Sequence, residues 1–307
     1  MKINIAISSF GNIGRAILKT HQEHVAKFGE EHDINVVAII RRNAGGSRHA
    51  DIPDNIPVIT DVRELKSNPD VILCAAPSAH VQEDVKKFLQ MGICTVDCYD
   101  SHSQIIKSRE ELGKIAKKNN TVSIFATGWD PGFDSIQRAL FAQLSPIGET
   151  FTTFGPGRSM GHTTEVKGIK GVQDAVSLTL PGDKPGTQKR KVYVVANEEQ
   201  QRIESEIKKH PYFVNDPTQV QFVPSIAEYD TNRHQGNLIN SVDDVAVELT
   251  LSGINPIMTA NMMYAAARAA YRACSNKEFG CFTVAERAPL DFIQGKTVEE
   301  RLLRIRY

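Results

Sequence analysis

The chain has 307 residues, enough for two domains, and its 36 Lys plus Arg balance its 36 Asp plus Glu to a formal net charge of zero. This balance gives no electrostatic basis for binding nucleic acid or an anionic membrane. The first ten residues hold too short an apolar run for a signal peptide, and no stretch approaches the ~20 apolar residues of a membrane span, so we expect a cytoplasmic protein. The five cysteines are odd in number and lack metal-ligand spacing, which favours reduced thiols and no metal site.

The first predicted elements are a strand, a glycine-rich turn and a helix. Residues 2–8 form a short apolar run. The turn that follows is nearly the dinucleotide fingerprint G-x-G-x-x-G, with Ser9 in place of the first glycine, and its expected cofactor contacts are Phe10, Gly11, Asn12, Ile13 and Gly14. The two remaining glycines carry the closer constraints, since one admits the pyrophosphate and the other lets the helix pack on the strand. Taken alone, the pattern also fits an ordinary turn.

A second predicted strand, residues 34–40, ends in Arg41 and Arg42. An NAD enzyme carries an Asp or Glu at this position to bind the ribose 2′-hydroxyl. Two guanidinium groups suit a 2′-phosphate instead, through charge-assisted hydrogen bonds. The pair therefore predicts NADP as cofactor, the alternative being two solvated cations at the start of a loop.

Strand and helix patterns then alternate. Residues 70–76, 93–98 and 121–126 are predicted strands, and residues 80–91 and 103–118 are predicted helices. This rhythm predicts an α/β fold of the Rossmann type, a doubly wound parallel sheet with helices on both faces. We expect the strand ends Arg41, Cys74, Asp100 and Asp130 to rim one crevice. Further cofactor contacts are expected at the strand ends Cys74, Ala75, Ala76, Pro77, Cys98, Tyr99 and Asp100.

The most informative corner is residues 127–132, Thr-Gly-Trp-Asp-Pro-Gly, between the last predicted strand and a helix. That helix carries apolar residues at i, i+4 and i+8, namely Ile136, Leu140 and Leu144. The Pro-Gly turn aims Trp129 and Asp130 past the carboxyl end of the strand, where open α/β sheets bind ligands. Asp100 and Asp130 end successive strands. Either could be a helix cap, but together they predict a negative pocket for an ammonium group.

The pattern changes near residue 151. Strands are predicted at residues 151–154, 191–196, 220–223 and 245–251, with one helix at residues 198–208, which is typical of an antiparallel, half-exposed sheet. We therefore expect a second, α+β domain for substrate binding and dimerisation.

An Ala-rich helix from Asn255 to about Arg272 follows and should return to the first domain. The predicted boundaries are residues 1–127 plus 256–307 for the dinucleotide-binding domain and residues 128–255 for the second domain.

Three other motifs are weaker. Residues 157–161 match the nucleophile elbow G-x-S-x-G, with His234 downstream, but they follow Gly-Pro-Gly in the second domain rather than a central parallel strand, so a glycine-rich loop over a small substrate is favoured. Residues 295–297 mimic a phosphate-binding loop without its upstream glycine. His21 and His24 share a helix face without a third ligand, and we expect them to be exposed. Arg190, His234 and Asn255 are uninformative singly.

Several blocks together resemble the meso-diaminopimelate D-dehydrogenase family over nearly the whole chain. The Trp-Asp-Pro-Gly and Phe-Gly-Pro-Gly blocks are far more specific than the glycine turn. The matching segments are residues 10–15, 95–100, 127–132, 154–157, 160–162, 171–176 and 280–284.

The resemblance implies an NADP-dependent enzyme that oxidatively deaminates the D-centre of meso-2,6-diaminopimelate to L-2-amino-6-oxopimelate and ammonia, and that runs the reverse reductive amination in lysine biosynthesis. It also implies a homodimer. Its implied contacts to the reacting end are Asp100, Trp129, Asp130, Phe154, Met160 and Gly161. Its implied contacts to the distal amino-acid end are Thr179, Arg190, His234 and Asn255.

Hydride can leave the α-carbon only when the amine on that carbon is neutral, so one group must first take a proton from the substrate ammonium. Asp130 is the expected base, with Asp100 or water as competitors, and His162 could activate the water that attacks the imine. Two departures from the family are Ser9, which is expected to reshape the pyrophosphate turn, and the short loop at residues 181–188, which is expected to widen the range of D-amino acids.

Two other functions are alternatives. A dihydrodipicolinate reductase or a sugar-type oxidoreductase is expected to use a Lys or His pair as proton donor, and none stands beside Trp129 and Asp130 in the sequence. An NADP-binding redox-sensing regulator would need a DNA- or partner-binding surface, for which the neutral charge gives no indication.

Overall fold

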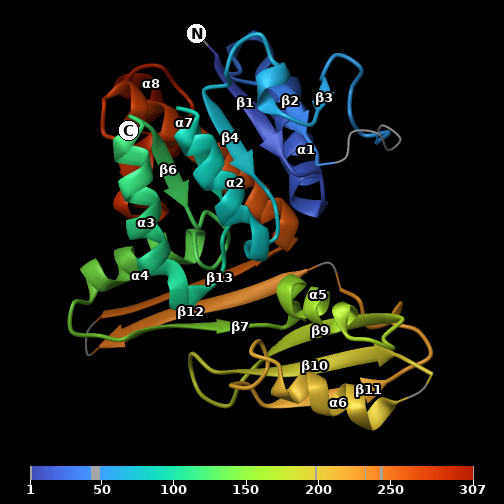
Figure 1. Cartoon of the computed structure of the whole chain (residues 1–307). Helices are drawn as coiled ribbons and strands as arrows, with labels where there is room; N and C mark the ends of the chain where they lie inside the picture. The colour runs from blue at the N-terminus through green and yellow to red at the C-terminus, as the bar shows by residue number, and fades with distance from the viewer. Residues whose placement is uncertain (1, 43–48, 198, 232, 243–244, 307) are drawn as a thin grey trace. The chain divides into compact units, whose positions relative to one another are not determined.

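The computed structural model describes residues 2–42, 49–197, 199–231, 233–242 and 245–306 (Figure 1). The chain divides into two compact units, Met1–Gln137 with Pro256–Tyr307, and Arg138–Asn255. In the described residues no helix is both long and apolar enough to cross a membrane.

The first unit is built on a parallel sheet, which in the described residues has seven strands in the order β14-β6-β5-β4-β1-β2-β3 (Figure 1). Strand β1 pairs with β2 on one side and with β4 on the other, so the chain order reverses there. Ligands of open α/β sheets bind at such a switch point, beyond the carboxyl ends of the strands. The strands are β1 Ile3–Ser8, β2 Ile34–Ile40, β3 Val58–Ile59, β4 Val71–Cys74, β5 Cys94–Asp97, β6 Val122–Phe125 and β14 Gly280–Thr283.

Helices cover both faces of this sheet because its strands are apolar on both faces. Ile5 and Ile7 of β1 lie in a core with residues of α1 and α7, while Ala6 between them lies in a second core with residues of α2 and α3. This confirms the doubly wound Rossmann-type fold. The helices of this unit are α1 Asn12–Phe28, α2 Ser78–Gln90, α3 Ile105–Lys118, α7 Asn255–Ser275 and α8 Val298–Arg304. Helix α4 Phe133–Leu144 begins in this unit and ends in the second one.

The second unit has α+β character, as expected, but its strands form two sheets. One has the order β13-β12-β7 and is antiparallel; the other has the order β11-β10-β9-β8. Strands β10 and β11 are parallel, because helix α6 connects them as a crossover. The elements are β7 Thr150–Phe154, β8 Gly157–Arg158, α5 Met160–Gly168, β9 Asp174–Pro181, β10 Gln188–Val195, α6 Gln200–Lys209, β11 Thr218–Phe222, β12 His234–Val242 and β13 Val245–Gly253.

The structure corrects several local expectations. Strands β9 and β12 were not predicted, because their sequences mix polar and apolar residues without strict alternation. Helix α6 begins at Gln200, and Glu198, where we expected it to begin, lies outside the described residues. The apolar series on α4 is not buried throughout, since Leu140 is 46% and Leu144 61% exposed.

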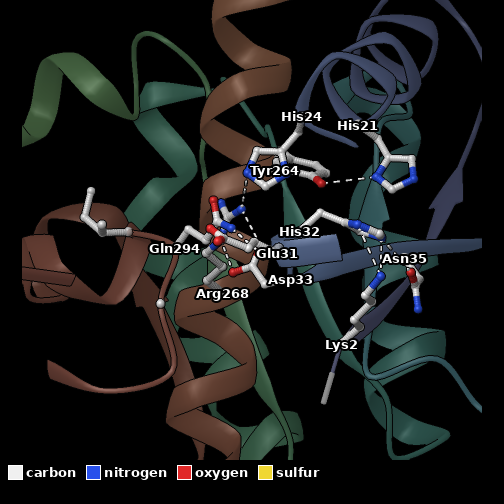
Figure 2. Close-up of polar contacts among 12 residues, drawn as sticks. Lys2, His21, His24, Glu31, His32, Asp33, Asn35, Tyr264, Arg268 and Gln294 are labelled. Carbon is white, nitrogen blue, oxygen red and sulfur yellow. Dashed lines mark hydrogen bonds and ion pairs between the residues drawn. The ribbon is translucent and has the colours of Figure 1, made fainter. Parts of the chain in front are cut away.

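Figure 2 shows that the expectation for His21 and His24 was wrong. Both lie half-buried on α1, where the His21 ring is 3.1 Å from the Tyr264 hydroxyl and Arg268 of α7 holds Asp33 through two hydrogen bonds of 2.8 and 2.7 Å (Figure 2). Burial is the largest cause of a lowered pKa at His21, to about 4. Sequence patterning could not show this, because α7 comes from the far end of the chain.

Candidate active site

The glycine turn after β1 has the geometry of a dinucleotide site despite its departure from the fingerprint. Ser9 takes a left-handed conformation, with φ of 74°, which the first fingerprint glycine normally supplies. A Cβ at Gly14 would lie 2.3 Å from the Ser9 carbonyl oxygen, so only glycine lets α1 pack this closely. Around Gly11, before the first residue of α1, a Cβ would meet no atom within 4 Å. The backbone there is open for a pyrophosphate at the helix N-terminus.

The two predicted arginines lie beside this turn. The Ser9 N–H donates to the Ile40 carbonyl at 2.9 Å, which joins the turn to the end of β2 directly before Arg41. The Arg42 side chain is 67% exposed and reaches Asp84 of α2 at only 4.0 Å, the edge of ion-pair range. An ion pair this long and this exposed contributes little to stability, so the Arg42 guanidinium is available to bind a stronger anion such as a phosphate.

The end of β4 continues the same edge. The Ala75 N–H donates to the Ser8 carbonyl at 2.9 Å, so residues 75–77 run beside the glycine turn. Burial raises the pKa of the Cys74 thiol well above its ordinary value and also raises that of Cys98. These cysteines stay protonated at neutral pH, so neither is a nucleophile. Cys74 is 0% exposed and belongs to the core of the unit, so its side chain does not line the crevice as the sequence predicted.

Asp100 is exposed at the end of the turn after β5 and is held by α2. The Ser78 hydroxyl donates to Asp100 Oδ1 at 2.6 Å, and the Asp100 N–H donates back to the Ser78 oxygen at 3.2 Å. Ser78, which the sequence did not single out, thus fixes a carboxylate that faces solvent.

The corner at residues 127–132 is a closed loop. The Gly128 N–H donates to the Pro131 carbonyl at 3.0 Å, and a Cβ at Gly132, whose φ is 144°, would lie 2.0 Å from the Gly128 oxygen. Trp129 is only 4% exposed, while the Asp130 carboxylate is 28% exposed and lies 3.6 Å from His102 Nε2. The expectation that the turn aims both side chains outward is therefore right for Asp130 and wrong for Trp129, because the corner closes on itself and buries the indole. His102 was not predicted.

Asp97, the last residue of β5, was also missed. It is 1% exposed, and its Oδ1 accepts hydrogen bonds from the Tyr99 N–H at 3.0 Å and the Ala126 N–H at 3.2 Å. Burial raises its pKa to about 6, against the opposing effect of these two donors. The sequence did contain a signal for Asp97, because an acidic residue stands directly after the buried run Cys-Thr-Val.

In the second unit, two glycines bring Phe154 and His234 together. A Cβ at Gly155, whose φ is 104°, would lie 2.6 Å from the Thr179 carbonyl oxygen, and a Cβ at Gly157 would lie 2.4 Å from the His234 Cα. The turn between β7 and β8 can therefore press against β9 and β12. The rings of Phe154 and His234 stack with centroids 6.0 Å apart.

Arg190 lies opposite Thr179 in the β9–β10 pair and donates to its hydroxyl. Its Nε donates to Asp216 Oδ2 at 2.7 Å, and the side chain is 7% exposed. Burial lowers the pKa of the guanidinium and the Asp216 hydrogen bond raises it, so the arginine keeps its charge at neutral pH. Two of the predicted distal contacts, Thr179 and Arg190, are thus neighbours, with Asp216 as a third member that the sequence did not reveal.

A general base needs a ring nitrogen that is free to accept a proton, and the hydrogen bonds of His162 leave neither nitrogen free. Its Nε2 lies 2.7 Å from the Tyr212 carbonyl and its Nδ1 lies 2.8 Å from the Ser159 hydroxyl. A carbonyl only accepts, so Nε2 carries the proton and Nδ1 accepts from Ser159. Burial lowers the pKa of His162 to about 3. Both ring nitrogens are used within the unit, which argues against the water-activating role that the sequence suggested.

The remaining predicted residues lie at helix starts. Met160 and Gly161 open α5, and Asn255 opens α7. Among the described residues, no group of three or more His, Cys, Asp or Glu could hold a metal ion, and all five cysteines are free thiols.

Comparison with known proteins decides the family. Residues 128–246 match the model of the diaminopimelic acid dehydrogenase C-terminal domain, and residues 1–101 match the model of the CoA binding domain. The meso-diaminopimelate D-dehydrogenase of Bacteroides fragilis is 36% identical over 305 residues, which cover 97% of each chain. This chain belongs to the meso-diaminopimelate D-dehydrogenase family. The enzyme of that name from Corynebacterium glutamicum is 34% identical over 94% of each chain.

Two solved structures have the same fold over the full length of this chain. The C. glutamicum DAP dehydrogenase in complex with DAP has a TM-score of 0.86 at 32% identity and covers 100% of this chain and 99% of its own. An engineered D-amino acid dehydrogenase bound to NADP+ has a TM-score of 0.81 at 30% identity and covers 100% of both chains. As a member of this dehydrogenase family, the protein is an enzyme and an oxidoreductase.

Proposed function

We propose that this protein is an NADP-dependent enzyme that oxidises the D-centre of meso-2,6-diaminopimelate to L-2-amino-6-oxopimelate and ammonia, and that it catalyses the reverse reductive amination. One observation of the structure carries the proposal. Two carboxylates, Asp100 and Asp130, follow adjacent parallel strands, β5 and β6, at the edge of a dinucleotide fold that also bears the glycine turn. An ammonium group on the carbon that loses hydride requires such a negative site.

NADP fits the residues of the first unit. The open backbone at Gly11, the close contact at Gly14 and the N-terminus of α1 suit its pyrophosphate. Arg41 and Arg42 would hold its 2′-phosphate. When bound, the nicotinamide supplies the hydride acceptor, and the protein supplies position and field.

The chain's own residues supply proton transfer. Asp130 is the proposed base that removes a proton from the substrate ammonium, so that hydride can leave the α-carbon of a neutral amine. Its carboxylate is accessible, and His102 at 3.6 Å could pass the proton to solvent. Water then adds to the resulting imine, and ammonia leaves. Asp100, fixed by Ser78, holds the amine.

Residues of the second unit are proposed to bind the distal amino-acid end of the substrate. Thr179, Arg190, His234 and Asn255 are the proposed contacts, with Arg190 as the cation for the far carboxylate. Asp216 fixes the Arg190 guanidinium through its Nε, so the orientation of this group does not have to be established when the substrate binds. Trp129, Phe154, Met160 and Gly161 are the proposed walls around the reacting end.

The test uses purified protein, NADP, and the meso, D,D and L,L isomers of diaminopimelate in separate assays of NADPH absorbance. We expect the meso isomer to be oxidised fastest. Only this isomer has both a D-centre, which Asp100 and Asp130 would bind, and an L-centre, which the distal contacts of the second unit would bind. No NADPH with any isomer, or the highest rate with the L,L isomer, would overturn the proposed substrate. D-Lysine, which lacks the distal carboxylate, serves as a further control and should react much more slowly.

We also propose that the protein is a cytoplasmic homodimer that pairs through exposed apolar residues of the second unit. Leu140, Leu144, Ile147 and Phe151 are 46, 61, 80 and 37% exposed, and the first two lie one turn apart on α4. Clustered exposed apolar side chains mark protein interfaces.

Replacing Leu144 and Ile147 together with Glu is expected to convert the dimer into a monomer, because two buried charges would face the partner. Analytical ultracentrifugation measures the mass. Ile106→Glu is the matched control, since Ile106 is a comparably exposed apolar residue, at 76%, on α3 of the first unit. A monomeric wild type, or a double variant that remains a dimer, would contradict this interface.

A further inference from the structure

The Asp97 carboxylate is the most completely buried acid near the proposed site, and the mechanism above does not use it. Its side chain ends β5 at 1% exposure. Its Oδ2 is buried and accepts no hydrogen bond from the residues that the structure describes. A buried carboxylate with one unsatisfied oxygen costs free energy, so another contribution must explain its presence here.

The hydrogen bonds of Asp97 connect two turns. Oδ1 accepts from Tyr99 N–H at 3.0 Å, in the turn that leads to Asp100, and from Ala126 N–H at 3.2 Å, in the turn that leads to Asp130. Its main-chain carbonyl accepts from the N–H of Thr127 at 2.7 Å and from the Thr127 hydroxyl at 2.5 Å. One residue therefore binds both segments that carry the proposed catalytic acids.

The second turn needs this support. Ala126 has φ of 56°, a left-handed conformation that a residue with a Cβ rarely adopts. Such strain persists only where surrounding contacts over-determine the backbone. The bonds of Asp97 to Ala126 and Thr127 supply contacts of this kind immediately before the closed corner of Trp129 and Asp130.

We propose that Asp97 is a positioning residue for the dehydrogenase reaction, which clamps the turns after β5 and β6 and so sets the relative positions of the Asp100 and Asp130 carboxylates. The inference rests on the proposed function, because it assigns the consequence of the clamp to that chemistry. Removing the clamp should slow turnover more than it weakens cofactor binding, since only Cys98, Tyr99 and Asp100 of the expected cofactor contacts lie in a clamped turn. The glycine turn and the two arginines lie on other strands. A displacement of about 1 Å in a reacting group can cost roughly 100-fold in rate.

The experiment compares three variants with the wild type. Asp97→Ala removes the acceptor from two buried N–H groups, and we expect kcat to fall about 100-fold while KM for NADP changes less than threefold. Asp97→Asn keeps an acceptor oxygen and should restore kcat to within tenfold of the wild type. Ser123→Ala is the matched control, because it removes the 3.0 Å hydrogen bond between Thr95 and Ser123 on the same two buried strands without touching either turn. It should leave kcat unchanged.

Stability is measured in parallel. Burial raises the Asp97 pKa to about 6 from 3.8, so this group favours the folded state at low pH and that contribution is lost as the pH rises through about 6. At pH 8 the Asp97→Asn variant should therefore melt at or above the wild-type temperature. Its activity then reports on positioning rather than on loss of the fold.

Hydrogen exchange gives a readout that does not depend on activity. Peptides covering Tyr99 and Ala126, whose N–H groups lose their acceptor, should exchange faster in Asp97→Ala than in the wild type. In Asp97→Asn and Ser123→Ala they should exchange as in the wild type. Unchanged exchange in Asp97→Ala, or a kcat within threefold of the wild type, would overturn the clamp. An Asp97→Asn variant as slow as Asp97→Ala would also overturn it, because the charge and not the hydrogen bonding would then be required. A wild type that oxidises no isomer of diaminopimelate, with exchange as expected, overturns the proposed function while the clamp itself stands.

Discussion

Replacing Asp130 with Asn is expected to lower kcat with meso-diaminopimelate about 10²- to 10⁴-fold, the range that a positioned general base contributes. The amide keeps the size of the side chain and can still accept a hydrogen bond, but it cannot take a proton from the substrate ammonium. Because Asp130 lies on the strand-end corner and not in the glycine turn, the dissociation constant for NADP should change little. Steady-state kinetics and cofactor titration by fluorescence measure the two quantities.

Two further variants make the Asp130 result specific. Asp100→Asn should weaken substrate binding more than turnover if Asp100 only holds the amine, and Glu23→Gln, on an exposed acid of α1 whose side chain is 67% exposed, should change neither. An Asp130→Asn variant with near wild-type kcat would move the base elsewhere. A large loss of kcat at Asp100→Asn would then identify Asp100 as that base.

Replacing both Arg41 and Arg42 with Ala is expected to raise KM for NADP about 100-fold while KM for NAD changes less than threefold. A hydrogen bond between charged groups contributes about 1.5–3 kcal/mol, and loss of one or two such bonds to the 2′-phosphate accounts for this factor. NAD has a hydroxyl there and loses nothing. The variant also frees Asp84, which Arg42 reaches only at 4.0 Å, so little stability should be lost.

The matched control for this cofactor experiment is Arg63→Ala. Arg63 belongs to the same unit, is 76% exposed and is paired with Asp61 at 2.8 Å, so it reports the effect of removing an exposed arginine that already has an acidic partner. It should leave both KM values unchanged. An equal rise for NADP and NAD in the double variant would show that the arginines do not recognise the 2′-phosphate.

The dinucleotide fold could be predicted because its signals are local. The apolar runs of β1, β2, β4, β5 and β6 alternate with helical periodicity, and glycine and proline mark the turns between them. Crossover connections between parallel strands are right-handed and short, so a chain of alternating strands and helices can adopt only a few topologies. The same reasoning placed Asp100 and Asp130 at strand ends on one edge, where the structure has them.

The second unit was less predictable, because its pairing is mostly non-local. Strand β7 pairs with β12, about eighty residues later in the chain, and the polar residues of β12 conceal its periodicity. In the apolar series of α4, Ile136 packs against the core of the first unit, whereas Leu140 and Leu144 are exposed in the single chain. Periodicity shows that a face is apolar and does not show what covers it.

By itself, the sequence determined strands β1, β2, β4, β5 and β6 of the dinucleotide-binding unit, the corner that places Asp130 beyond the end of β6, and the family, since turn chemistry and side-chain periodicity are properties of short segments. It did not predict β3, β14 or α8, and it did not show that the corner buries Trp129. Only the tertiary structure decided which polar groups are used up by their neighbours. Both ring nitrogens of His162 form hydrogen bonds, with Ser159 and Tyr212, and Asp97 joins turns nearly thirty residues apart. Hydrogen bonds and burial depend on which distant segments meet, and that is settled when the whole chain has packed.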